Sequence, residues 1–239
     1  MKLLFIGILF STTAFLAASK AKHTVQDEQS PIASFSTTGA SDPNEQSLRL
    51  KRDKFYERFT FGLPALDLLD NGKPVNEGTI EITDCFAPGV RERLAIEAGT
   101  ILVGATSDAK AFFSGNKKHV YTEFSFVIEQ VIKDKATHPL NVNDRILIGR
   151  WGGRLRFPAG KVEQFTIKTL GMPKSGRRLV LFLERHEEEQ FFYVITGYEL
   201  GNGIISPLDN LDEHKLPFSA FRGSDELEFL KLIKEKVSQ

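Results

Sequence analysis

The acidic and imidazole side chains that could together hold a metal ion, or carry out acid–base chemistry, gather near the C-terminal end of the sequence. They are Asp209, Asp212, Glu213 and His214. Calcium loops and zinc-binding helices space their ligands in fixed patterns, and this cluster matches neither pattern. We therefore interpret it as a solvated acidic loop. The alternative is a hydrolase whose site is assembled from separated residues, with Asp209, Asp212 and His214 as its candidates.

The sequence lacks the short motifs of common catalytic and cofactor sites. It contains no Gly-x-Ser-x-Gly elbow, no His-Glu-x-x-His pair and no glycine-rich phosphate or dinucleotide loop. The single cysteine, Cys85, excludes an internal disulfide and a cysteine-rich zinc site. A free cysteine usually packs as a small apolar side chain, which is our interpretation of Cys85. We predict no catalytic residue, no metal and no cofactor.

Basic residues are concentrated between positions 145 and 178, where Glu163 is the only acidic residue, whereas the chain after 184 is rich in acidic residues. Arginine next to aromatic rings can hold an anionic or stacked ligand. This pattern predicts a basic binding face. It would consist of Arg150, Trp151, Arg154 and Arg156. The competing interpretation, which the neutral total charge favours, is that basic and acidic strands pair with each other inside the fold. A second alternative is that strand alternation simply places Arg154 and Arg156 on the solvated face.

The composition is that of a folded domain. The chain has 239 residues, 41% of them hydrophobic and 26% charged, which is typical of a protein with a packed core rather than a disordered one. The 31 Lys and Arg residues balance the 31 Asp and Glu residues, so net charge gives no reason to expect nucleic acid as a partner.

The N-terminal segment has the pattern of an export signal. A short positive start is followed by an uncharged, mostly apolar run over 3–18, which is shorter than the ~20 residues of a membrane-spanning helix. Ser19-Lys20-Ala21 then supplies the small-x-small pattern of a cleavage site. We predict a signal peptide at 1–21, export to the periplasm or the outside, and no stable membrane span after cleavage. An anchor formed by an uncleaved N-terminal segment is the alternative.

Residues 22–47 are polar and carry few apolar side chains, so we predict a flexible linker there and a single domain over 48–239. The segment from Ser47 to Phe61 could be a short helix capped by Ser47 or an extended strap. At the C-terminal end, Ser224 as N-cap and an apolar stripe predict a helix over 224–237 that docks on the core. The stripe consists of Leu227, Leu230, Ile233 and Val237, with Phe229 on its border.

Short runs rich in β-branched and aromatic residues predict a mainly β domain. The runs cover 79–83, 100–103, 120–131, 145–150, 154–157, 161–168, 178–183 and 190–196. Gly152-Gly153 is expected to form a two-residue hairpin, and the acidic tip near His186 is expected to be solvated. Many short strands without intervening helices indicate a sandwich or a barrel.

The run 120–131 alternates most clearly and predicts a long strand with one face in the core and one in water. The inward set is Val120, Phe124, Phe126 and Ile128. The outward set is Tyr121, Glu123, Ser125 and Glu129.

Three segments resemble uncharacterised exported bacterial proteins whose strands are similar to the netrin/TIMP-like version of the OB fold. They are 101–104 (ILVG), 121–129 (YTEFSFVIE) with the turn 131–134 (VIKD), and 176–183 (GRRLVLFL). The resemblance covers about 99–208 and implies a barrel of five to six strands or more with a binding role. The disulfides and the N-terminal cysteine of eukaryotic members are absent here, so no functional residue carries over.

Together these features predict an exported, non-enzymatic binding or interaction module that engages an anionic surface polymer or a protein. Besides the hydrolase, the other alternative is a structural envelope component that packs against its neighbours through exposed Phe112 and Phe113. These two residues could equally form a core pair at a strand end, which is the commoner arrangement.

Overall fold

The computed structural model describes residues 32–34, 42–58, 69–70, 73–74, 79–82, 98–135, 138–167, 170–209 and 221–237. Strands make up most of its regular structure, which confirms the mainly β fold expected from the sequence. The predicted signal peptide at 1–21 lies outside the described residues, as do Cys85, Asp212, Glu213 and His214. Within the described part of the chain, no helix combines the length and apolarity needed to cross a bilayer.

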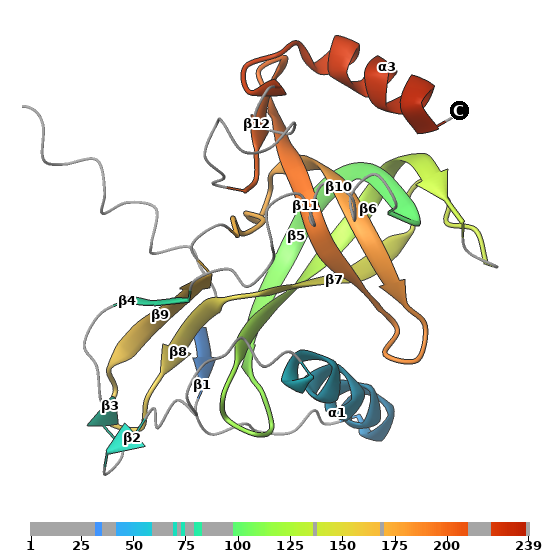
Figure 1. Cartoon of the computed structure of the whole chain (residues 1–239). Coiled ribbons are helices and arrows are strands. Elements are labelled where there is room, and N and C mark those ends of the chain that lie inside the picture. Colours follow the sequence, from blue (N-terminus) through green and yellow to red (C-terminus); the bar gives the residue numbers. More distant parts are fainter. Residues whose placement is uncertain are drawn as a thin grey trace, which may run out of the picture.

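Six strands form the main sheet (Figure 1). In their order across the sheet they are β10 (Arg178–His186), β5 (Thr100–Phe113), β6 (Val120–Asp134), β7 (Arg145–Trp151), β11 (Phe191–Gly201) and β12 (Ile204–Pro207). Neighbours in this order are antiparallel except β7 and β11, which run parallel where Ile148 pairs with Phe192. β10 also pairs with β11, so it has a strand neighbour on each side.

A smaller sheet of four strands has the order β1, β8, β9, β4. Their bounds are Ile32–Ser34, Gly153–Arg156, Val162–Ile167 and Thr79–Ile82. The short strands β2 (Leu69–Asp70) and β3 (Lys73–Pro74) pair with each other. Each of the eight predicted runs contains a strand, and the largest difference is β5, which continues past the predicted end at 103 to Phe113.

The pair Gly152-Gly153 does not form the predicted hairpin. β7 ends at Trp151 in the six-stranded sheet, whereas β8 begins at Gly153 in the four-stranded sheet. Gly152 has a φ of 105° and Gly153 a φ of 147°, values that side chains with a Cβ rarely adopt. The Thr122 hydroxyl donates to the Gly152 carbonyl at 2.8 Å. The glycines therefore carry the chain from one sheet into the other.

The core of the main sheet is built from the inward residues of five strands. It consists of Leu102, Phe124, Phe126, Ile128, Ile148, Leu179, Leu181, Leu183, Phe192 and Val194. Phe124, Phe126 and Ile128 therefore face inward as predicted. Each such side chain contributes about 1.5–3 kcal/mol when it is fully buried.

The opposite face of β6 was expected to be wet, and this expectation is wrong for its first half. Tyr121 is fully buried and Glu123 is 4% exposed, because the helix α1 (Pro43–Glu57) packs against both. Ser125 is half-buried and Glu129 is exposed. Alternation along a strand shows that its two faces differ, but it does not show what covers either one.

α1 begins at Pro43, within the segment predicted as a linker at 22–47, and β1 also lies in that segment. The helix is capped by Asp42, whose carboxylate accepts from the Asn44 amide at 3.0 Å, and Ser47 lies inside the helix. Asp42 followed by proline is a strong start signal, since proline fits the first helical position and an aspartate side chain satisfies a free amide.

The C-terminal helix α3 (Glu226–Val237) is present as predicted, but its cap and its buried face differ in detail. Asp225, rather than Ser224, accepts from the amides of Leu227 at 2.9 Å and Glu228 at 3.1 Å. Phe229 packs against Tyr198 of β11, whereas Leu227 is 76% exposed. Figure 1 shows α3 at the end of the main sheet opposite α1.

Gly104→Ala should destabilise the fold by about 1–3 kcal/mol, because an added Cβ would overlap the Val127 carbonyl oxygen and lie 2.7 Å from the Phe126 ring. The matched control is Gly99→Ala, where a Cβ meets no atom within 4 Å. Urea unfolding measures both variants. Equal stability of Gly104→Ala and Gly99→Ala would show that β5 and β6 are not in this close register.

Candidate functional site

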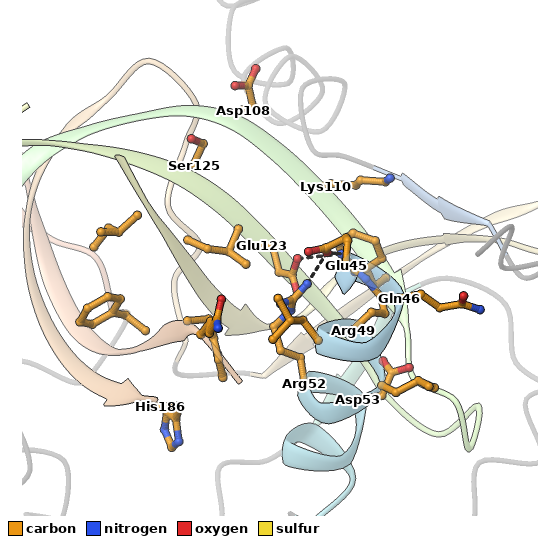
Figure 2. Close-up of a pocket in the computed structure, with 18 of the residues that line it drawn as sticks. Glu45, Gln46, Arg49, Arg52, Asp53, Asp108, Lys110, Glu123, Ser125 and His186 are labelled. Carbon is orange, nitrogen blue, oxygen red and sulfur yellow. Dashed lines mark hydrogen bonds and ion pairs between the residues drawn. The ribbon is translucent and has the colours of Figure 1, made fainter. Parts of the chain in front are cut away.

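A groove of about 1600 Å³ lies between α1 and the main sheet. It is bordered by α1, by β5, β6 and β7, and by the turn that joins β10 to β11 (Figure 2). Many of the charged side chains in its lining come from α1 and β6, which we call the charged half, while apolar side chains of β7 and β11 belong to what we call the apolar half. This open groove is the candidate functional site.

Buried ion pairs hold α1 against β6. The Arg52 Nε atom lies 2.8 Å from Glu123 Oε1, and Arg49 Nη2 lies 3.1 Å from Glu123 Oε2. Glu45 pairs with both arginines, at 3.0 Å from Arg49. Arg52 also donates to the Glu189 carbonyl at 3.3 Å, which ties the helix to the β10–β11 turn. Figure 2 shows both arginines directed toward Glu123.

The spacing of these residues follows from the helix. Positions 45, 49 and 52 are four and three residues apart, so they share one face of α1. The Arg49 guanidinium also lies 3.3 Å from the centre of the Phe112 ring, a cation–π contact with β5. One helical face thereby reaches two strands and a turn.

Burial changes the protonation equilibria of the acidic and phenolic groups beside the helix. Burial raises the pKa of Glu123, and the charges of Arg49 and Arg52 act against this shift. Burial also raises the pKa of Asp53, although that carboxylate accepts a 2.6 Å hydrogen bond from the Tyr121 hydroxyl. Burial raises the pKa of Tyr121 as well. Both carboxylates are bound to neighbouring side chains, which is an arrangement for holding α1 in place.

Aromatic contacts also hold α1 against the sheet. Tyr56 stacks on Tyr121 with ring centres 4.0 Å apart and meets Trp151 edge-on at 4.8 Å. Phe55 contacts Phe191 edge-on at 5.1 Å. These pairs add specific geometry to their apolar burial, about 0.5–1.5 kcal/mol each.

The apolar half of the groove has a charged rim. Its floor is formed by Ala109, Leu140, Ile146, Leu147 and Phe192. On the rim, Arg145 lies 3.5 Å from Asp108, with both side chains exposed, and Arg185 lies 2.9 Å from Glu187. Exposed pairs of this kind contribute at most about 1 kcal/mol, so a ligand could rearrange them at little cost.

The four residues of the predicted basic face do not share an open surface. Arg150 is fully buried, and its Nη2 atom lies 2.7 Å from Asp209 Oδ1 and 3.1 Å from the Ile195 carbonyl. Trp151 is buried beside Tyr56, Arg154 is half-buried and Arg156 is exposed. For Arg150, the structure follows the competing interpretation, in which a basic strand pairs with the acidic C-terminal part.

Asp209, a candidate for the hydrolase, is also engaged within the fold. Besides Arg150, it accepts hydrogen bonds from the Thr196 hydroxyl at 2.7 Å and from the Gly171 amide at 3.0 Å. The other two hydrolase candidates lie outside the described residues. No group of three or more His, Cys, Asp or Glu residues suited to a metal ion occurs in the described ranges.

The structure also decides the exposure of His186 and of the pair Phe112-Phe113. His186 was expected to be solvated, but its ring lies 4.3 Å from Phe55 and stacks on Phe191 at 5.2 Å, and burial lowers its pKa. Phe113 is 2% exposed and belongs to an apolar cluster with Leu155, while Phe112 lies under Arg49. Phe113 is therefore a core residue at a strand end, which is the alternative expected from the sequence, whereas Phe112 is half-buried and lines the groove.

No protein-family model matches this chain, and no curated protein matches it significantly. The site is therefore interpreted from its own geometry.

The groove could not be predicted from the sequence, because its charged wall comes from α1. The sequence left that segment open between a short helix and an extended strap. The available signal was the spacing of Glu45, Arg49 and Arg52 on one helical face after the Asp42-Pro43 start. Nothing in that spacing names Glu123 as the partner, since the partner lies on a strand far along the chain.

Arg52→Met should lower the free energy of unfolding by about 3 kcal/mol, because it leaves Glu123 buried with Arg49 as its remaining counter-ion. Arg58→Met is the control, since Arg58 is 68% exposed and lies 3.9 Å from Glu189, and it should cost less than about 1 kcal/mol. Denaturant unfolding compares the two. Similar small losses of unfolding free energy in both variants would contradict the role of the buried ion pair in holding α1 against β6.

His119 should make the fold less stable in acid. Burial lowers the pKa of His119 to about 4, against a usual 6.5, so the unfolded chain takes up a proton first as the pH falls. The resulting loss is absent above pH 6.5 and grows toward pH 4. Between pH 7.5 and 5, the free energy of unfolding should therefore fall less in His119→Gln than in the parent, by on the order of 1 kcal/mol. The exposed His138→Gln is the control, and identical pH profiles for all three proteins would rule this out.

Proposed function

We propose that this chain is an exported, non-enzymatic binding module built on an OB-like barrel, with the groove beside α1 as its binding site. The single observation that carries the proposal is the groove itself: a large open site in which the buried acidic and basic groups already bind one another. Such a site offers surface for a partner without a free nucleophile–base pair among the residues described.

The pairing of strands supports the barrel. Starting from β5, the neighbours run through β6, β7, β11 and β10 and return to β5, because β10 pairs with both β11 and β5. In chain order, β7 and β11 are the third and fifth of these five strands, and they form the parallel pair. An OB-like barrel is expected to have this arrangement.

The N-terminal sequence supports export. The apolar run over 3–18 and the Ser19-Lys20-Ala21 site have the features of a signal peptide. An exported module with a groove of this size would meet surface polymers and other exported proteins, which are the two partner classes expected from the sequence.

Ser125→Trp should abolish binding, because Ser125 lines the groove and an indole there fills space without removing an apolar core contact. Ser206→Trp, on the exposed edge strand β12, is the matched control. Thermal unfolding is measured with dextran sulfate, with polygalacturonate and with a library of random peptides. A bound partner at about 100 times its Kd should raise Tm by about 5 °C in the parent and in Ser206→Trp.

No Tm shift with any partner, or equal shifts in Ser125→Trp and Ser206→Trp, would show that the groove is not the binding site. Turnover of peptide, ester, phosphate or glycan substrates by the parent would instead favour the hydrolase.

A further inference from the structure

The strand β7 has an open edge inside the groove. It pairs with β6 along its whole length, but with β11 only at Ile148 and Gly149. Among the described strands, residues 145–147 therefore have a neighbour on one side only. A strand edge without a neighbour presents backbone donors and acceptors that another extended chain can satisfy.

The lining of the groove confirms that it passes this edge. Ile146 packs against the inner core of the main sheet, whereas Leu147 packs against the aromatic cluster of Tyr56 and Trp151. Neighbouring residues of a strand point to opposite faces, yet both of these line the groove. A groove that touches both faces of one strand must wrap around its edge.

The size and charge of the groove select the kind of occupant. Its volume of about 1600 Å³ exceeds the ~300–1000 Å³ of typical small-molecule sites. Its lining holds five Arg or Lys residues and six Asp or Glu residues, so an anionic polymer would meet no excess of positive charge. An extended polypeptide needs no such excess, because its backbone can bind the strand edge and its side chains can fill the apolar floor.

We infer that the groove binds an extended polypeptide segment, which adds as a strand along residues 145–147 of β7. The inference rests on the proposed binding function of the same groove and names its partner class. Three residues of strand span about 10 Å, so three or four residues of the peptide pair with β7. The remaining affinity comes from its apolar side chains on Ile146, Leu147 and Phe192.

The probe is a phage-displayed library of random linear 12-residue peptides, panned on the full chain without its predicted signal peptide. Selected peptides should carry apolar residues at every second position, and fluorescence polarisation of the synthetic peptides should give a Kd that changes less than threefold between 50 and 500 mM NaCl. Ser125→Trp should weaken binding at least tenfold, and Ser206→Trp should leave it unchanged. Circular dichroism confirms that both variants are folded.

Backbone N-methylation of a selected peptide tests strand addition without changing the protein. Methyl groups on alternate amides along one edge of the peptide should weaken binding at least tenfold, and those along the other edge less than threefold. Equal effects from both sets, apolar residues at helical spacing, or a steep loss of affinity with salt would overturn the inference. If dextran sulfate protects the protein and no peptide is selected, the inference falls while the proposed binding function stands; if neither binds, both fall.

Discussion

The buried ion pair between Arg52 and Glu123 is the contact on which the rest of the site depends. Two charges removed from water are stable only when each is fully paired, and here Arg49 and Glu45 complete the set. Arg52 is 1% exposed and Glu123 is 4% exposed, so any shift of the helix that separated the two while they stay buried would leave a charge without its partner. The pair therefore fixes where α1 lies, and α1 forms one wall of the groove.

The other wall follows from the way the main sheet curves. β7 meets β11 over two residues only, and the chain then leaves β7 through Gly152 and Gly153 into the smaller sheet. The beginning of β7 is thus left beside the β10–β11 turn, which Arg52 holds through the Glu189 carbonyl. One helix consequently contacts both the charged half of the groove and the turn beside its apolar half.

Among the described residues, a second set of charges is also used inside the fold. Arg150 and Asp209 form a second buried pair, distant from α1 in the sequence, that joins β7 to the segment after β12. Arg150, one of the residues that suggested an external anionic partner, is thus satisfied internally. At the groove rim, Arg145 and Asp108 are paired and exposed, and half-buried Arg185 is paired with Glu187. Apolar surface and backbone, rather than net charge, are therefore what the site offers a ligand.

The sequence by itself determined eight of the strands, the inward face of β6 and the C-terminal helix, because these depend on periodicities that each segment carries alone: Phe124, Phe126 and Ile128 alternate, and Leu230 and Ile233 share a helical face. Only the tertiary structure decided that α1 covers Tyr121 and Glu123, and that Arg150 lies inside. Burial of a charged residue depends on a counter-ion from a distant segment, and no local pattern records which segment will supply it.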